Sequence, residues 1–210
     1  MRPLRIAVTK GRLEKKAANL FTTMGLDCAR FNAKGRKLIV PVDDYEVVIA
    51  KAADVITYVE QGACDIGIVG KDTIVEYAAE IYETTDLGFG KCFFALAAEK
   101  GKHFYEGYNK KVIATKYPNV ARKFFEGKGM DVRIIKIEGS VELAPLLGLA
   151  DAIVDIVETG TTLRENGLEV VEEIMPVSAR IIVNIASMKM RKEEIESFLA
   201  DAETAKEFIE

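Results

Sequence analysis

The stretch DIVETGTTL, residues 155–163, contains the junction that decides the fold. An apolar run carrying one carboxylate, Asp155, reads as a buried strand. It gives way to three threonines around Gly160, and Leu163 then resumes an apolar, helix-like pattern. A buried strand that passes through a short polar loop into a helix is the unit from which α/β folds are built.

The same alternation of strands and helices continues along the chain. The segments that read as strands are residues 5–9, 37–40, 46–50, 65–69, 91–98, 111–115, 131–137, 152–157, 169–174 and 179–186. Helical patterns occupy residues 13–24, 54–61, 118–127 and 141–148, a stretch reaching about residue 79, a short stretch after Thr161, and the end of the chain from Arg191. The pattern favours an α/β architecture with largely parallel sheets.

Two such sets of similar size predict two lobes. We expect residues 1–88 and 179–210 to form the first lobe and residues 89–178 the second, so that the chain passes between them twice. Ligands of α/β folds bind at the carboxyl ends of strands, which predicts an active site in a cleft between the lobes.

Composition excludes several classes of protein. The chain of 210 residues has a net charge of −4 and no lysine or arginine cluster, which argues against a nucleic-acid-binding protein. No apolar run approaches the roughly 20 residues of a membrane span, and the amino terminus does not resemble a signal peptide. We therefore expect a cytoplasmic protein without nucleic-acid or membrane partners.

Cysteine and histidine chemistry is also limited. The three cysteines lack Cys-x-x-Cys spacing, so we interpret them as reduced core residues and predict no zinc site. His103 is the only histidine and lies in a polar, loop-like stretch. A histidine-based catalytic triad or metal cluster is thereby excluded.

The loop of residues 159–162 is the strongest candidate for an anion site. Backbone N–H groups at the start of a helix are free to bind a phosphate, Gly160 allows a close approach, and the three threonines add hydroxyl donors. The alternative interpretation is a simple N-cap, which explains one threonine but not three. Asp155 beside such a loop is suited to accept hydrogen bonds from the vicinal hydroxyls of a ribose.

Three other strand ends carry candidate ligands. Residues 9–12, Thr-Lys-Gly-Arg, place two cations around a glycine, and Lys51 ends another strand. Such cations suit nucleotide phosphates or a departing pyrophosphate, although a solvated turn has the same appearance. Gly67 to Thr73 form a glycine-rich end suited to a flat base, although an ordinary tight turn between a strand and a helix looks the same. It matches neither a Walker sequence nor Gly-x-Gly-x-x-Gly.

Together these residues resemble a known family. The block EGSVELAPLLGLADAIVDIVETGTTLRENGL, residues 138–168, is similar to the signature of the ATP phosphoribosyltransferase family, the first enzymes of histidine biosynthesis. RIAVTKGRL, ADVITYVEQGACDIGIVGKD and ATKYPNVARKFF also resemble segments of that family, in the same order, so the resemblance covers nearly the whole chain.

The resemblance implies a fold, a reaction and site residues. The fold would be that of the type II periplasmic binding proteins. The reaction would convert ATP and 5-phosphoribosyl 1-pyrophosphate into N1-(5-phosphoribosyl)-ATP and pyrophosphate, with Mg²⁺ whose ligands are unknown. Thr159, Gly160, Thr161 and Thr162 would hold the 5-phosphate, Asp155 the ribose hydroxyls with help from Glu158, Lys10, Gly11, Arg12 and Lys51 the phosphates, and Gly70 and Asp72 the nucleotide.

The place where the chain ends suggests a partner. Longer members of the family carry a carboxyl-terminal regulatory domain, whereas this chain resembles the short form, which pairs with a regulatory subunit related to histidyl-tRNA synthetase. We therefore expect homodimers within a hetero-oligomer; a truncated long form is the competing explanation. Two further alternatives are a non-catalytic protein that binds a small anion and a phosphoribosyltransferase of the common fold. The latter usually shows two adjacent acids, whereas Asp155 and Glu158 are separated.

Overall fold

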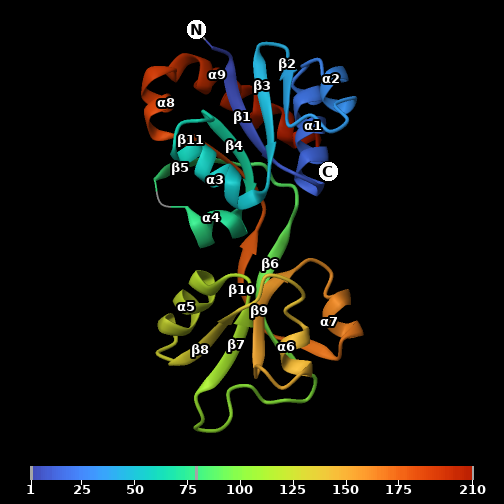
Figure 1. Ribbon diagram of the computed structural model, residues 1–210, viewed down its shortest axis with the longest axis vertical. Helices are drawn as coiled ribbons and strands as arrows, with labels where there is room; N and C mark the ends of the chain where they lie inside the picture. The colour runs from blue at the N-terminus through green and yellow to red at the C-terminus, as the bar shows by residue number, and fades with distance from the viewer. Residues whose placement is uncertain (1, 79, 210) are drawn as a thin grey trace. The chain divides into compact units, whose positions relative to one another are not determined.

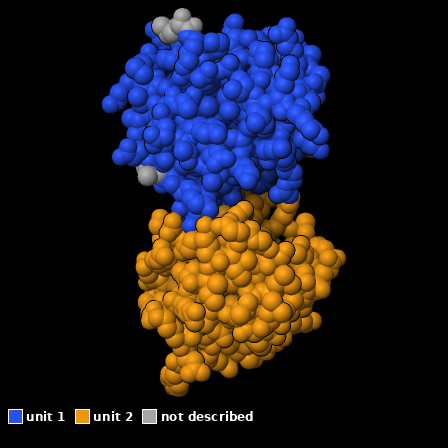
Figure 2. Space-filling model, viewed as in Figure 1, with its two compact units in different colours: residues 1–90, 178–210 blue, residues 91–177 orange. Residues whose placement is uncertain are grey.

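A computed structural model describes residues 2–78 and 80–209 and divides the chain into two compact units. Unit 1 consists of residues 1–90 and 178–210, and unit 2 of residues 91–177 (Figure 2). The first crossing thus falls two residues later than the sequence interpretation placed it, and the second one residue earlier. The carboxyl-terminal segment belongs to unit 1.

Unit 1 is built on a six-stranded mixed sheet with the order β2-β3-β1-β4-β11-β5 (Figure 1). Strand β1 pairs in parallel with β3 and β4, while β2, β11 and β5 are antiparallel to their neighbours. The strands are β1 (Leu4–Thr9), β2 (Ile39–Val42), β3 (Tyr45–Ala50), β4 (Ile66–Gly70), β5 (Ile81–Asp86) and β11 (Ala179–Asn184). The helices are α1 (Arg12–Thr23), α2 (Ala29–Asn32), α3 (Ala52–Glu60), α4 (Lys71–Tyr77), α8 (Ile185–Met190) and α9 (Lys192–Ala205), followed by the 3₁₀ turn η1 (Lys206–Phe208).

Both faces of this sheet are buried. Successive residues of β1 point to opposite sides, so this one strand contributes to the core on each face. Ile6 and Val8 pack in the cluster that contains α1 and α9, where the rings of Phe21 and Phe198 lie 6.4 Å apart. Ala7 packs in the cluster on the other face, which includes Val55 and other residues of α3. The continuous apolar run of β1 therefore reflects a strand with helices on both sides.

Unit 2 contains a five-stranded mixed sheet with the order β10-β6-β9-β7-β8. Strand β7 pairs in parallel with β8 and β9, and β6 is antiparallel to β9 and β10. The strands are β6 (Cys92–Glu99), β7 (Lys111–Thr115), β8 (Val132–Lys136), β9 (Ala152–Val157) and β10 (Leu168–Val177). The helices are α5 (Pro118–Gly127), α6 (Leu143–Leu146) and α7 (Thr161–Glu165).

Several details of the sequence interpretation are wrong. The sheets are mixed rather than largely parallel, because only the strands next to β1 and β7 are parallel to them. Strand β5 was not expected, since it is a polar edge strand in which only Thr85 is buried. The helix expected over residues 141–148 shrinks to α6, and Gly148, with a φ of 69°, follows its end. The helix expected from Arg191 is preceded by α8, and residue 79 lies outside the described residues.

The expectations for the cysteines and for His103 are confirmed. Cys28 and Cys64 are buried, Cys92 is half-buried, and all three are free thiols. His103 is exposed in a loop. Across residues 2–78 and 80–209, none of the helices combines the length and apolar character needed to span a membrane.

Candidate active site

Two of the cations predicted to bind phosphate, Lys10 and Lys51, follow the carboxyl ends of neighbouring strands of unit 1. Parallel pairing aligns Thr9 with Ala50, so Lys10 and Lys51 leave neighbouring strands at the same level. The backbone N–H of Lys10 donates to the Ala50 carbonyl oxygen at 2.8 Å. The Thr9 hydroxyl donates to the Ile68 carbonyl oxygen at 3.1 Å, which fastens the end of β1 to β4. Both lysines are exposed.

Gly11 shapes the turn between β1 and α1. Its φ of 103° and ψ of −126° belong to a region that side-chain-bearing residues rarely adopt. Its N–H donates to a carboxylate oxygen of Glu14 at 3.2 Å, and Glu14 also pairs with Lys34. Burial alone would raise the pKa of Glu14, but the bonds from Lys34 and Gly11 outweigh it and lower that pKa. Glu14 thus stays charged and braces the turn that carries Lys10 and Arg12.

Gly70 and Asp72 lie where β4 passes into α4. A Cβ atom on Gly70 would come within 2.0 Å of Oδ1 of Asp72, so the carboxylate packs directly over the glycine. The Thr73 hydroxyl donates to Oδ2 of Asp72 at 3.2 Å. Lys71 forms an ion pair with Glu83 at 2.5 Å, unlike a Walker lysine, which binds phosphate. Gly70 and Asp72 therefore join Lys10 and Lys51 at the carboxyl ends of β1, β3 and β4.

In unit 2 the loop of residues 158–160 follows β9, which lies between β6 and β7. The buried Thr115 at the end of β7 donates its hydroxyl to the Val154 carbonyl oxygen at 2.6 Å. It also accepts the N–H of Tyr117 at 2.8 Å. These bonds fix β9 against β7 just before the loop begins. Gly160 adopts φ 69°, ψ 8°, a left-handed conformation that glycine reaches without strain.

Hydrogen bonds within the loop differ from the simple picture of three free hydroxyls. The Thr159 hydroxyl donates to Oγ1 of Thr161 at 3.1 Å, and the Thr161 N–H approaches Oγ1 of Thr159 at 3.4 Å. Arg164 reaches back to the loop from α7, with one N–H on the Thr159 carbonyl oxygen and one on Oγ1 of Thr161, both at 3.0 Å. Because α7 has only five residues, its dipole contributes little; the threonines, Gly160 and Arg164 form the loop's polar surface.

The two candidate carboxylates occupy different positions around this loop. Asp155 is half-buried on β9 opposite Ala95 of β6. Glu158 is exposed in the loop itself. Each takes part in at least one interaction within the protein, so neither is an isolated charge.

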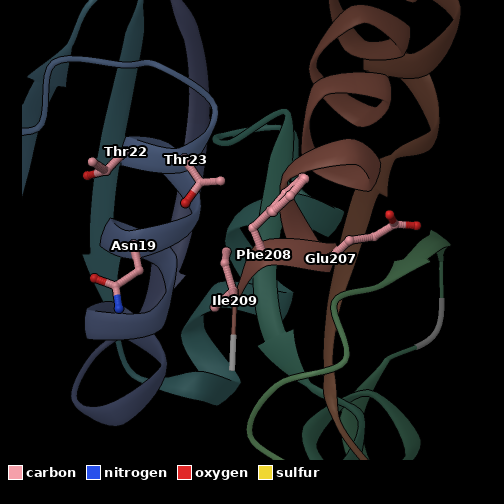
Figure 3. A pocket seen from close by; sticks show the side chains of 6 residues that line it. All are labelled: Asn19, Thr22, Thr23, Glu207, Phe208 and Ile209. Carbon is pink, nitrogen blue, oxygen red and sulfur yellow. The ribbon is translucent and has the colours of Figure 1, made fainter.

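Among the described residues, neither a cluster of metal ligands nor the cavity beside α1 includes the predicted site residues. In the part of the chain that the structure describes, no three His, Cys, Asp or Glu side chains converge as a metal cluster. A cavity of about 670 Å³ lies between α1 and the carboxyl-terminal segment of unit 1 (Figure 3). Its lining residues are Asn19, Thr22, Thr23, Glu207, Phe208 and Ile209, none of which is a candidate site residue.

The predicted residues therefore fall into two groups, one in each unit, and each group lies at the carboxyl ends of strands of that unit's sheet. The expected location of the site in a cleft between lobes stays a prediction. Sequence reasoning missed Glu14 and Arg164. The capping-box spacing, an acid three residues after Gly11, points to Glu14, and a cation three residues after Thr161 on a helix points to Arg164.

The two units, each a mixed sheet with polar loops at strand ends, define an α/β protein of the type II periplasmic-binding-protein architecture. A solved structure with the same fold is the periplasmic aliphatic sulphonate binding protein SsuA from Escherichia coli (TM-score 0.60, 10% identity, 98% of this chain and 73% of that chain). At this identity the likeness shows the fold alone.

Closer relatives define the family. The HisG model, described as ATP phosphoribosyltransferase, matches residues 51–204. Proteins named ATP phosphoribosyltransferase are 60% identical in Clostridium kluyveri, over 94% of this chain and 91% of the relative, and 60% identical in Clostridium botulinum, over 93% and 94%. The structure titled ATP phosphoribosyl transferase (HisG:HisZ) complex from Thermotoga maritima matches with a TM-score of 0.84 and 36% identity, over 98% of this chain and 99% of that one. The chain belongs to the ATP phosphoribosyltransferase family.

Proposed function

We propose that this protein transfers the 5-phosphoribosyl group of 5-phosphoribosyl 1-pyrophosphate to N1 of ATP and releases pyrophosphate, as the first step of histidine biosynthesis. The observation that carries this proposal is the 60% identity over 94% of the chain to a protein named ATP phosphoribosyltransferase. The family model over residues 51–204 supports it independently of any one relative.

The phosphoribosyl donor is assigned to unit 2. The loop of residues 159–162 would bind the 5-phosphate through its backbone N–H groups and hydroxyls, with Gly160 allowing the close approach. Asp155, on the strand that leads into this loop, would accept hydrogen bonds from the ribose hydroxyls. Glu158 would assist on the same side of the sugar.

The nucleotide and the departing pyrophosphate are assigned to unit 1. Lys10, Arg12 and Lys51 provide positive charge close to the ends of β1 and β3. Gly70 and Asp72, whose carboxylate packs over that glycine at the end of β4, would contact the nucleotide.

The bond change needs few protein groups. The C1–O bond to pyrophosphate breaks, the electron pair leaves with the pyrophosphate oxygen, and N1 of adenine forms the new bond with its own lone pair. Positive charge develops on the sugar in the oxocarbenium-like transition state, and the carboxylates of Asp155 and Glu158 would stabilise it. Because N1 is already nucleophilic, no serine, cysteine or histidine nucleophile is required, in keeping with the exposed His103.

Mg²⁺ is proposed as the cofactor. In phosphate chemistry this ion is commonly held by one or two carboxylates together with substrate phosphates, so it does not need a dedicated protein cluster. Asp155 and Glu158 of unit 2 carry the hard oxygen atoms that Mg²⁺ prefers and would hold the ion together with the substrate phosphates. When bound, the ion neutralises charge on the pyrophosphate group.

A regulatory partner is part of the proposal. The similar structure from Thermotoga maritima is a HisG:HisZ complex, and this chain covers 99% of the matched chain there. We propose that the chain forms homodimers within a hetero-oligomer that includes a subunit related to histidyl-tRNA synthetase, and that the assembly is cytoplasmic.

The test is an assay with ATP, 5-phosphoribosyl 1-pyrophosphate and Mg²⁺, run with and without the regulatory subunit. Formation of phosphoribosyl-ATP, followed by its ultraviolet absorbance, is the expected result. Absence of product under both conditions, with folded protein, would refute the proposal and would leave a non-catalytic anion-binding protein as the alternative.

A further inference from the structure

Arg164 lies folded against the loop that carries the three threonines. It stands on α7, three residues after Thr161, and its guanidinium spans the loop: Nη1 bonds to the Thr159 carbonyl oxygen and Nη2 to Oγ1 of Thr161, both at 3.0 Å. A Cβ atom on Gly160 would come within 3.1 Å of Nη1. The glycine therefore also makes room for the arginine to reach the loop.

This contact determines what the Thr161 hydroxyl can do. Its oxygen accepts one hydrogen bond from the Thr159 hydroxyl at 3.1 Å and one from Arg164 at 3.0 Å. A hydroxyl oxygen has two lone pairs, so with both occupied its proton is left to be donated. Thr161 is thereby prepared as a hydrogen-bond donor, whereas the Thr159 hydroxyl is committed within the loop.

The loop also needs positive charge if an anion is to bind there. Asp155, Glu158 and Glu165 all lie on or beside it and would repel a phosphate dianion. The guanidinium has five N–H donors, and two are used on the loop. The remaining donors have no hydrogen-bond partner within residues 2–78 and 80–209, and Arg164 is exposed.

We propose that Arg164 is a positioning and specificity-determining residue for the phosphorylated end of the donor substrate. It holds the Thr161 hydroxyl in the donor orientation and contributes its own charge, so that the loop selects a phosphate monoester dianion over an unphosphorylated sugar. This inference rests on the proposed function and deepens it, because it names the group that gives the loop its preference.

The purely structural alternative is that Arg164 only caps the carbonyl oxygen of Thr159. Three variants separate the two roles. Arg164→Met removes both the bonds and the charge, Arg164→Lys keeps the charge, and Thr161→Val removes the hydroxyl that Arg164 orients. Arg133→Met is a matched control, because Arg133 is an exposed cation on β8 of the same unit.

The measurements are the KM for each substrate with the full chain and its regulatory subunit, and calorimetric binding of ribose 5-phosphate to the chain. Arg164→Met should raise the KM for 5-phosphoribosyl 1-pyrophosphate roughly tenfold to a hundredfold, the range expected for losing hydrogen bonds to a charged group. The KM for ATP and kcat should change by less than about twofold, because the lost binding is equal in ground and transition states. Arg164→Lys should recover part of the loss, and ribose 5-phosphate binding should weaken in parallel.

A variant that combines Arg164→Met with Thr161→Val shows whether Arg164 and Thr161 act together. If Arg164 orients Thr161, the effects of Arg164→Met and Thr161→Val on donor binding should be less than multiplicative. Unchanged donor KM in Arg164→Met, or equal rises for donor and ATP, would overturn the inference. A wild-type protein that makes no product would instead refute the proposed function, so the two failures are distinguishable.

Discussion

The backbone N–H of Lys10 donates to the carbonyl oxygen of Ala50 at 2.8 Å, which holds the ends of β1 and β3 together. Lys51 follows Ala50 directly, so two cations separated by 40 residues in sequence leave the sheet side by side. Parallel strands place their carboxyl ends at a common edge, and the loops at this edge can act on one ligand.

The first prediction concerns this pair of cations. Lys51→Gln should raise the KM for ATP roughly tenfold, because one charge-assisted hydrogen bond to a phosphate is lost. Stability should hardly change, since Lys51 is exposed. The control is Lys37→Gln, which removes an exposed lysine of the same unit. Equal ATP kinetics in the two variants would show that Lys51 does not face the phosphates.

The second prediction contrasts two glycines of β4. In Gly70→Ala the new methyl group would displace the Asp72 carboxylate, whose oxygen lies 2.0 Å from the added Cβ atom. That shift can be absorbed by a side chain, so the protein should fold but bind ATP weakly. In Gly67→Ala the methyl group meets Ile182 at 2.8 Å and Val59 at 2.9 Å in the core.

For Gly67→Ala we therefore expect a loss of about 1–3 kcal/mol in the free energy of unfolding from overpacking. Chemical denaturation and ATP titration of both variants provide the measurement. If Gly70→Ala lost stability and kept its ATP affinity, the assignment of Gly70 and Asp72 to the nucleotide would be wrong.

The third prediction separates the two carboxylates beside the phosphate loop. Asp155→Asn should lower kcat/KM for the donor roughly a hundredfold, as expected when a group that stabilises transition-state charge is neutralised. Glu158→Gln should have a smaller effect, because Glu158 is exposed and screened by water. Steady-state kinetics with varied donor at saturating ATP measure both. A larger effect at Glu158 would reverse the assigned roles.

The fourth prediction concerns stability. Asp65 is 1% exposed and receives bonds from both ends of the chain: Arg2 at 2.6 Å and Arg191 at 3.4 Å, as well as the Ser187 hydroxyl at 2.7 Å. Asp65→Asn should reduce the free energy of unfolding by about 3 kcal/mol, since it removes the buried charge that pairs with Arg2 and Arg191, although Arg191 keeps its ion pair with Glu194. Asp44→Asn, in an exposed turn, is the control.

The pH dependence of this effect has a defined sign. Burial would raise the pKa of Asp65, but the hydrogen bonds from Arg2, the Arg5 N–H and Ser187 outweigh it and lower that pKa. The stabilisation is therefore complete above the unfolded pKa of about 3.9 and is lost as the pH falls through the lower folded pKa. Urea unfolding should show a full and constant difference in the free energy of unfolding between the wild type and Asp65→Asn above about pH 5, and a difference that shrinks in acid. A difference that is independent of pH would contradict the charged state of Asp65.

Much of the fold could be predicted because β1, β4 and β9 are mostly apolar and lead into segments that contain glycine or hydroxyl residues. The positions of Lys10, Lys51, Gly70 and the threonine loop at strand ends followed from those same runs. The family resemblance then supplied the ligands, which periodicity alone does not identify.

What could not be predicted depends on contacts between distant segments. Strand β5 has almost no apolar alternation, since it pairs with β11 alone at the sheet edge. The mixed pairing arises because β11 returns beside β4 from residues 179–184, which local pattern does not reveal. Arg164 was not singled out from the sequence, and only its three-dimensional contact with Thr159 and Thr161 connects it to the loop.

The central claim is that this chain forms a bond between the ribose of 5-phosphoribosyl 1-pyrophosphate and N1 of ATP. The most direct measurement is ³¹P NMR and mass analysis of one reaction mixture containing the chain, its regulatory subunit, both substrates and Mg²⁺. The account predicts pyrophosphate and N1-(5-phosphoribosyl)-ATP in equal amounts, with no release when ATP is left out. Pyrophosphate released without ATP, or ATP left unmodified while donor is consumed, would contradict it.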